Sequence, residues 1–313
     1  MKHERSLAYA AFAIVCVVWG TTYLFIRIAL ETLPPLLLTG TRYIAAGSIL
    51  FAIARLRGIA IPRDRRTLAS LALVGFLMVG LGNLAVVWAE QWVPSGMAAL
   101  FVATAPFWMA IIEAFRANGE RVNLRGGIGL FIGFAGVAML VTPGGSGNSW
   151  GLMFILGALA IQLGGLGWQL GSAQAKYNLQ HVPFLASVSL QMLFGGVMVT
   201  IVGFAIGEGP RYVFSARTFG ALAYLVLVGS VITYSAYVFA LNHMRTIHTS
   251  LYAYVNPVVA VFLGWLVLDE LLTPLSIVAM VVILAGVALV QSSGWTRKST
   301  ATPTEVEPVK EVA

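Results

Sequence analysis

Ten long runs of apolar residues divide this chain of 313 residues. Each run holds about 20 residues, which is the length of an α-helix that crosses a bilayer. The runs do not alternate apolar and polar residues with a period of two, which argues against a β-barrel. The pattern predicts ten transmembrane helices, at residues 7–29, 35–56, 68–90, 95–115, 124–142, 151–173, 184–206, 218–240, 247–267 and 274–293.

The composition supports an all-α integral membrane protein. Hydrophobic residues make up 59% of the chain and charged residues 10%, whereas soluble domains carry about 25% charged residues. The net charge of +7 does not indicate nucleic acid, because the basic residues lie mostly in short gaps between apolar runs. The single cysteine, Cys16, cannot build a disulfide framework or a thiolate metal site. We expect the first apolar run to be an uncleaved span.

The distribution of Lys and Arg predicts the orientation in the membrane. If the N-terminus is cytoplasmic, three basic residues face outward (Arg27, Arg211 and Arg217) and Arg42 lies within the membrane. The other 15 of the 19 basic residues then fall on the cytoplasmic side. An even number of spans places the C-terminus on the same side, so we expect both termini in the cytoplasm.

The chain also repeats itself. Trp19, Arg27 and Pro34 each precede a similar residue by 149 positions: Trp168, Lys176 and Pro183. Further along, Pro106 and Pro257 correspond at an offset of 151. Two five-helix repeats follow, residues 1–145 and 146–293. Because five is odd, the second repeat enters the membrane upside down, a frequent plan of transporters with a central cavity. Residues 294–313 form a polar tail that we expect to be disordered and cytoplasmic.

Several motifs resemble one family. They are VVWGTTYLFIRIAL in the first run, a proline-led second run with an arginine in LTGTRYIAAG, the segments ATAPF and YVNPVV, and acidic turns before AGVAML and AGVALV. The chain resembles the drug/metabolite transporter (DMT) superfamily, EamA-type, and is most similar to the YddG-type amino acid exporters. The resemblance implies a ten-helix transporter of the bacterial inner (plasma) membrane with a small-molecule substrate. The second half departs from the first, with GWQLGS in place of WGTTYL and Gln191 in place of Arg42.

Arg42 is the one basic residue deep in an apolar run. It lies roughly 12 Å along the helix from Pro34, and an unpaired charge at such depth costs about 2.5–3.5 kcal/mol even on insertion scales. Two readings explain it. Either Arg42 faces a cavity and attracts a substrate carboxylate, or it pairs with backbone carbonyls, Glu31 or Glu90 and fixes its helix.

Aromatic and amide residues within the spans are the other candidates for a substrate site. Trp19 and its repeat mate Trp168 would approach from opposite halves and form an aromatic wall; simple packing between helices is the alternative. Together with Arg42, the predicted cavity residues are Trp19, Tyr23, Asn83, Trp108, Gln162, Trp168, Gln169, Tyr234, Tyr237, Tyr252 and Asn256.

Pro106 and Pro257 lie within spans, where each removes a backbone hydrogen bond and kinks its helix. The kinks could be hinges for alternating access, or could set the shape of the cavity without moving.

The sequence lacks the motifs of other mechanisms. It holds no GxxxxGK[ST], HExxH or CxxC, so we expect no direct use of ATP, no catalytic residue, no metal site and no cofactor. Acidic residues and histidines fall at or near span ends, whereas proton-driven carriers place ionisable groups in the core. We therefore expect alternating access without strict proton coupling.

The function expected from these observations is export of small metabolites, with neutral or aromatic amino acids foremost. A drug or nucleotide-sugar carrier of the same fold is the alternative, and a non-transporting membrane scaffold or sensor is a further one. A nucleotide sugar needs several cations in the cavity, and Arg42 alone qualifies. We expect contact with membrane lipid, no nucleic acid partner, and a monomer or homodimer.

Overall fold

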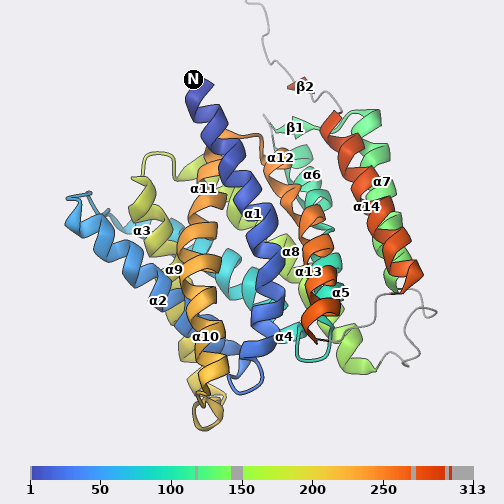
Figure 1. Cartoon of the computed structure of the whole chain (residues 1–313). Coiled ribbons are helices and arrows are strands. Elements are labelled where there is room, and N and C mark those ends of the chain that lie inside the picture. The colour runs from blue at the N-terminus through green and yellow to red at the C-terminus, as the bar shows by residue number, and fades with distance from the viewer. Residues whose placement is uncertain (1, 117–118, 142–150, 269–272, 293–295, 298–313) are drawn as a thin grey trace, which may run out of the picture.

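The helices of the chain confirm the predicted fold class. In the computed structural model, residues 2–116, 119–141, 151–268, 273–292 and 296–297 are described. Eight of its helical stretches are long and apolar enough to cross a membrane, and two shorter apolar stretches, Leu124–Gly136 and Ile277–Val290, accompany them. These ten stretches correspond one to one with the ten predicted spans. Apart from the turns and two short strands, almost every described residue is helical (Figure 1).

The elements follow one another in a simple order. The first half holds α1 (Lys2–Ala29), α2 (Pro35–Leu56), α3 (Arg65–Gly75), η1 (Phe76–Asn83), α4 (Leu84–Ala89), α5 (Ser95–Val102), α6 (Ala105–Phe115), β1 (Glu120–Arg121) and α7 (Leu124–Val141). The second half holds α8 (Leu152–Asn178), α9 (Phe184–Ala205), η2 (Gly209–Arg211), α10 (Ala216–Tyr224), η3 (Leu225–Ile232), α11 (Thr233–His243), α12 (Thr246–Ser250), α13 (Tyr252–Leu268), α14 (Pro274–Ser292) and β2 (Thr296–Arg297). The strands β1 and β2 form one short antiparallel pair.

Four of the ten spans are not regular α-helices. The third and eighth spans each contain a π-helical segment, η1 and η3, where the wider turn changes the direction of side chains and is often found at functional sites. The fourth span is interrupted at 103–104, between α5 and α6, and the ninth at Leu251, between α12 and α13. Interruptions at membrane depth are tolerated where they are buried in protein or line a cavity.

The irregularities recur at one spacing. The segment η1 covers 76–83 and η3 covers 225–232, which is an offset of 149 at both ends. The helices α2 and α9 begin and end at the same offset. Gly58 and Gly207, which follow these two helices, both have positive φ angles, of 66° and 84°, a conformation that glycine adopts without steric strain. The halves therefore share local backbone geometry as well as sequence.

The helices pack mainly across the halves. The helix α2 packs against α9, α1 against α13 and α11, and α8 against η1 and α4. The helices α7 and α14 lie side by side at one edge of the molecule (Figure 1). A Cβ atom on Gly286 would lie 2.5 Å from the backbone nitrogen of Gly133, so only glycine permits this close approach.

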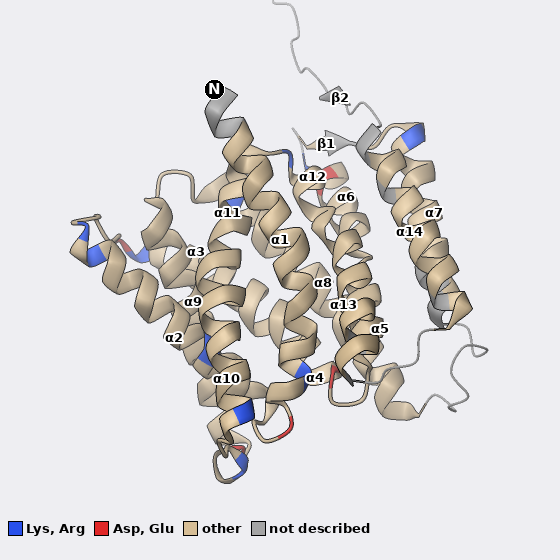
Figure 2. Cartoon of the chain, viewed as in Figure 1, with Lys and Arg blue, Asp and Glu red and all other residues tan. Residues whose placement is uncertain are grey.

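Charged residues lie chiefly towards the two ends of the helices (Figure 2). Some of them cap helices. The buried carboxylate of Glu208 accepts hydrogen bonds from the backbone nitrogens of Leu36 and Leu37, at 3.3 and 2.8 Å, and so satisfies the start of α2. Asp64 caps α3 through the backbone nitrogen of Thr67.

Candidate functional site

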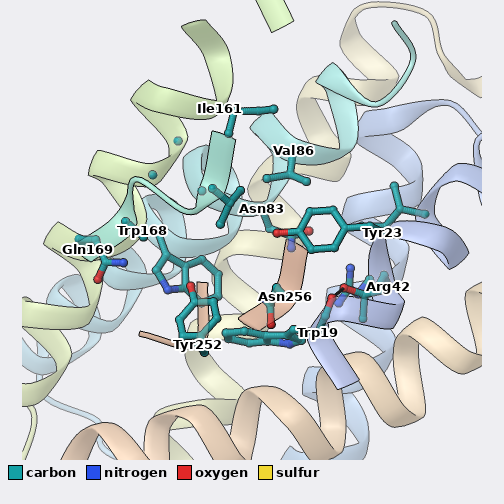
Figure 3. Close-up of a pocket in the computed structure, with 17 residues that line it drawn as sticks. Trp19, Tyr23, Arg42, Asn83, Val86, Ile161, Trp168, Gln169, Tyr252 and Asn256 are labelled. Atoms are coloured by element: carbon teal, nitrogen blue, oxygen red, sulfur yellow. Dashed lines mark hydrogen bonds between the residues drawn. The ribbon is translucent and has the colours of Figure 1, made fainter. Parts of the chain in front are cut away.

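A cavity lies between the two halves in the middle of the bundle. It contains about 600 Å³ of space free of protein atoms, part of it open to solvent. Eight of the twelve predicted cavity residues line it: Trp19, Tyr23, Arg42, Asn83, Trp168, Gln169, Tyr252 and Asn256 (Figure 3). They come from α1, α2, η1, α8 and α13. A cavity with apolar walls and a few convergent polar groups is typical of a small-molecule site.

The cavity lies towards one end of the helix bundle. On α1 its lining begins at Trp19 and continues towards the C-terminal end of the helix, through Thr22, Tyr23 and Ile26. On α8, which runs the opposite way, the lining begins at Ile161 and ends at Gln169. The cavity therefore extends from the middle of the bundle towards the end where α1 finishes.

Arg42 lines this cavity and is 2% exposed. Its Nε donates a hydrogen bond to the Oγ of Ser230 in η3 at 2.8 Å, and its guanidinium carbon lies 4.9 Å from the centre of the Tyr43 ring. Of the acidic partners expected from the sequence, Glu31 instead pairs with Arg217, at 3.1 Å. Among the described residues, Arg42 forms no ion pair, and its Nη1 has no hydrogen-bond partner. The positive charge is therefore held in place and left partly unsatisfied.

The aromatic residues form one continuous cluster at the inner limit of the cavity. The rings of Trp19 and Trp168 meet edge to face with centres 5.3 Å apart, and Tyr252 lies 4.8 Å from Trp19. Such pairs add about 0.5–1.5 kcal/mol beyond the burial of their area. The indole nitrogen of Trp19 donates to the carbonyl of Gly229 in η3 at 3.1 Å. The two repeat-related tryptophans thus do meet across the halves.

Several polar atoms on the cavity wall are buried without a partner. Within the described residues they are Nη1 of Arg42, Oδ1 of Asn83, Nε1 of Trp168, and both Nε2 and Oε1 of Gln169. Leaving such a group unsatisfied costs about 1–3 kcal/mol. Figure 3 shows Arg42 and Gln169 on opposite sides of the cavity, with Asn83 between them. Donors and acceptors therefore face the same cavity from different helices.

Two predicted residues lie next to the cavity and not on its wall. The Oε1 of Gln162 accepts hydrogen bonds from Thr104 at 2.7 Å and from the indole of Trp108 at 3.3 Å. Its Nε2 donates to the carbonyl of Phe101 at 3.0 Å. Gln162 therefore satisfies the backbone where α5 gives way to α6. A contact of Gln162 or Trp108 with substrate stays a prediction.

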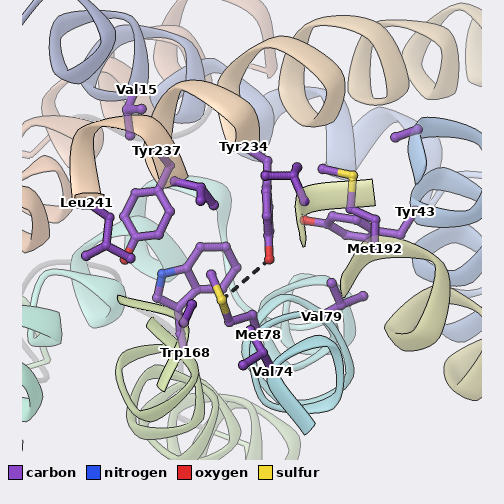
Figure 4. Close-up of a cluster of buried hydrophobic side chains, with 14 of the residues drawn as sticks. Val15, Tyr43, Val74, Met78, Val79, Trp168, Met192, Tyr234, Tyr237 and Leu241 are labelled. Carbon is purple, nitrogen blue, oxygen red and sulfur yellow. Dashed lines mark hydrogen bonds between the residues drawn. The ribbon is translucent and has the colours of Figure 1, made fainter. Parts of the chain in front are cut away.

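The two predicted tyrosines of α11 are fully buried in the core (Figure 4). The hydroxyl of Tyr234 donates to Oε1 of Gln191 at 3.2 Å, and that of Tyr237 is 2.7 Å from the hydroxyl of Ser172. Both rings pack against Trp168, at 5.8 and 5.5 Å. They support the tryptophan that lines the cavity.

The two prolines differ in position. Pro106 lies in the first turn of α6, directly after the interruption at 103–104, where proline is well tolerated. Pro257 lies inside α13, a few residues after the interruption at Leu251. Both spans are broken near their prolines, and a kink or a hinge at either position stays a prediction.

Sequence reasoning missed part of the wall and the anchor of Arg42. Small and aliphatic residues complete the lining: Thr22, Ile26, Gly82, Val86, Val102, Ala105, Ile161, Gly164 and Gly165. Ser230 and Gly229, which hold Arg42 and Trp19, belong to the π-helical segment η3. The offset of 149 between Gly80 and Gly229 was a signal that could have drawn attention to this segment.

The described residues contain no cluster of metal-binding side chains. Within the described residues, no set of three or more His, Cys, Asp or Glu side chains is placed to hold a metal ion. The chemistry available in the cavity is that of recognition, through one cation, amides, hydroxyls and aromatic faces.

Comparison with solved structures bears on the fold. One crystal structure superposes with a TM-score of 0.72 at 20% sequence identity, and the match covers 91% of this chain and 96% of the other. At that identity the likeness shows the same arrangement of helices and nothing more specific.

Comparison of sequences identifies the family. The chain is 37% identical over 284 residues to the uncharacterized inner membrane transporter YedA of Escherichia coli K12, a match that covers 90% of each chain. It is 26% identical over 287 residues to a probable amino-acid metabolite efflux pump of Salmonella typhimurium, covering 87% of this chain and 91% of that one. The model of the EamA-like transporter family matches twice, at residues 6–142 and 155–292. The chain therefore belongs to the EamA-like transporter family of the drug/metabolite transporter superfamily, and it is a multi-pass inner membrane transporter.

Proposed function

We propose that this protein exports small metabolites, most of all neutral or aromatic amino acids, by alternating access without strict proton coupling. The observation that carries the proposal is the set of polar atoms on the cavity wall that have no hydrogen-bond partner. This set contains one fixed cation and several amide acceptors. A zwitterion of matching size satisfies both kinds of group. The name of the Salmonella relative points the same way.

Arg42 is the proposed anchor for the substrate carboxylate. Ser230 holds the guanidinium from one side. Arg42 lines the cavity, and its Nη1 has no hydrogen-bond partner within the described residues. A carboxylate there gains a charge-assisted hydrogen bond of about 1.5–3 kcal/mol. The amide oxygens of Asn83 and Gln169 are acceptors suited to the substrate ammonium, and the rings of Trp19, Trp168 and Tyr252 offer faces for an apolar side chain.

The charge of the cavity argues against the rival substrates. Among the residues that the structure describes, Arg42 is the one Lys or Arg on the wall of this cavity, whereas the two phosphates of a nucleotide sugar call for several cations. No Asp or Glu of the described part of the chain belongs to the same wall, and a carboxylate is what a lipophilic cationic drug would require. The missing carboxylate is also the reason to propose transport without strict proton coupling.

For the mechanism, we propose that residues 1–145 and 146–293 rock about the middle of the bundle. The broken spans containing Pro106 and Pro257 are the proposed hinges. With both termini in the cytoplasm, as the basic residues favour, the cavity described above faces outward. Export then requires an alternative state in which the other end opens for loading.

The test is transport by purified protein in liposomes. Labelled neutral and aromatic amino acids are compared with the methyl ester of one of them, a nucleotide sugar and a lipophilic cation. We expect the amino acids to move without a pH gradient and the ester to move poorly. Arg42→Ala should lower kcat/KM for the amino acid by about tenfold or more and should abolish the preference over the ester.

Arg217→Ala is the matched control, because Arg217 is exposed and forms its ion pair with Glu31 outside the cavity. It should leave transport unchanged. If the protein moves only the nucleotide sugar or only the lipophilic cation, the proposal of amino acids as substrates is wrong and that compound class takes their place. Accumulation driven by a pH gradient would overturn the uncoupled mechanism.

A further inference from the structure

A buried carboxylate joins the two halves at the end of the molecule opposite to the cavity mouth. Glu113 lies near the end of α6 and is fully buried. Its Oε1 accepts hydrogen bonds from the hydroxyl of Tyr177 in α8 at 3.0 Å and from that of Thr246 in α12 at 3.2 Å. Both donors belong to the second half of the chain, whereas Glu113 belongs to the first.

Further contacts tighten the same region. Lys176 donates from Nζ to the carbonyl of Met244 at 2.6 Å, which ties α8 to the end of α11. The guanidinium of Arg116 lies 3.8 Å from the centre of the Tyr177 ring. The helices α6 and α12 meet at the end where α1 begins (Figure 1). This end is closed to the cavity, because the cavity lining on α1 extends from Trp19 only in the other direction. A separate pocket at this end, between the end of α8 and the start of α9, shares no lining residue with the cavity.

The repeat allows a comparison with the open end. The positions that correspond to Glu113 and Thr246 at an offset of 151 are Gly264 and Ser95. The position that corresponds to Tyr177 at an offset of 149 is Ile28. A glycine and an isoleucine cannot form the side-chain bond that Glu113 and Tyr177 form. The bond between Glu113 and Tyr177 therefore has no counterpart at the matching positions. Other carboxylates link the halves at the open end, where Glu31 pairs with Arg217 and Glu208 caps the start of α2.

Two other buried acids lie near the open end: Glu208, which caps α2 from the opposite half, and Glu90. Glu90 occupies a different kind of place from Glu113. It follows α4 and precedes α5, so it lies within the first half and at the turn between two consecutive spans. Arg27, whose Nη1 donates to the Glu90 carbonyl, also belongs to the first half.

We infer that Glu113 is a carboxylate latch that holds this end of the transporter shut and thereby determines which side the cavity faces. The inference rests on the alternating access of the proposed function, but not on the identity of the substrate. Opening the closed end separates α6 from α8 and α12, so the two hydrogen bonds to Glu113 must break. Hydrogen bonds to charged groups are strong enough to shift a two-state equilibrium by about tenfold or more.

The chain carries its own reporter for the closed end. Cys16 is the single cysteine, it is 7% exposed, and it lies on α1 one turn before Trp19, away from the cavity lining. The amide nitrogen of Asn256, in its hydrogen-bonded orientation, donates to the Cys16 carbonyl at 2.9 Å and so links α13 to this part of α1. A thiol reagent reaches Cys16 from the α1 start only when that end opens.

The experiment measures the rate at which a charged, membrane-impermeant maleimide labels Cys16 in the full-length protein in oriented vesicles. Glu113→Leu should increase labelling from the side of the N-terminus by about tenfold. Glu113→Gln, which keeps an acceptor oxygen, should give a smaller increase. Tyr177→Phe and Thr246→Val each remove one donor and should fall between the wild type and Glu113→Leu.

The control is Glu31→Gln, which removes an exposed carboxylate at the other end. It should leave labelling unchanged. Equal labelling of wild type and folded Glu113→Leu would overturn the latch, as would an equal increase in Glu31→Gln. If Glu113→Leu does not fold, the two donor variants decide in the same way. Failure to move amino acids, with labelling changed as expected, would overturn the proposed substrate and leave the latch standing.

Discussion

The two tryptophans at the centre of the molecule occupy matching positions but differ in their bonding. Trp19 and Trp168 are 149 residues apart in the sequence and meet edge to face. The indole of Trp19 donates to the Gly229 carbonyl of η3, whereas the indole nitrogen of Trp168 has no partner within the described residues. One ring is thus fixed by the opposite half, and the other has a donor left for a ligand.

Arg42 and Gln191, which also share the offset of 149, extend the comparison. Arg42 lines the cavity, while Gln191 is fully buried in the core and bonded to Tyr234 and to Ser187. The backbone framework of the two halves is repeated, including the π-helical segments η1 and η3. The chemistry attached to it is not repeated, so the first half brings the cation to the cavity wall through Arg42, while the matching position of the second half brings a core amide.

The largest effect is expected from giving position 42 the glutamine of position 191. Arg42→Gln removes the cation from the cavity and should lower kcat/KM for an amino acid by about tenfold or more. Gln191→Leu removes a polar group from the core and should leave kcat/KM within about twofold of the wild type, since Gln191 does not touch the cavity. Initial rates in liposomes measure both. Equal losses in the two variants would contradict the asymmetry.

A smaller effect, on stability, should separate the two tryptophans. Trp19→Phe leaves the Gly229 carbonyl without its indole donor, which costs about 1 kcal/mol. Trp168→Phe removes a donor that has no partner, so that it loses no hydrogen bond. In detergent, the Tm of Trp19→Phe should be the lower of the two, whereas KM should rise more in Trp168→Phe. A reversed order of Tm values would show that the bond to Gly229 contributes little.

Much of this fold follows from the sequence because the bilayer demands long apolar helices. The run at 35–56 ends where α2 ends, and the aromatic wall follows from two tryptophans at mid-span in matching positions. Hydrophobicity alone also explains why Arg42 stands out. These features depend on single residues and on the period of the repeat, both of which can be read directly.

The rest depends on geometry that apolar runs do not encode. The segments η1 and η3 are more apolar than α3, α10 and α11, but apolarity does not specify a π-helical turn, so no pattern predicts that Ser230 faces Arg42. Gln162 was expected on the cavity wall but is bonded to the interruption at 103–104, which is apolar on both sides. Glu113 lies near the end of its span, yet neighbouring helices bury it completely.

A still smaller effect should distinguish two glycines of the π-helical segments. A Cβ atom on Gly229 would lie 3.0 Å from Cγ2 of Thr22 and 3.2 Å from Nη2 of Arg42. A Cβ atom on Gly80, its mate at an offset of 149, would meet only the side chain of Phe76, at 3.1 Å. Gly229→Ala should displace Arg42 and raise KM by about fivefold, and Gly80→Ala should raise it less. Similar KM values in liposome transport would argue that Arg42 tolerates the shift.

The smallest effect concerns the caps of α3 and α10, which begin at corresponding places in the two halves. Asp64 accepts a hydrogen bond from the backbone nitrogen of Thr67 at 2.8 Å, and Ser215 from that of Thr218 at 3.1 Å. The bonds to Thr67 hold the pKa of Asp64 below its ordinary value of 3.8. The cap is therefore at full strength above pH 3.8 and is lost as pH falls through the lowered folded pKa.

Ser215 does not titrate, so acid should loosen one helix start and spare the other. Amide hydrogen exchange, corrected for its intrinsic dependence on pH, should show protection falling in the first turn of α3 and staying constant in that of α10. Asp64→Asn keeps a side-chain acceptor without a titrating group and should remove the difference. A parallel fall in both helices would indicate general acid unfolding, whereas a fall confined to α3 shows that even the shared framework of the halves is fastened by different chemistry.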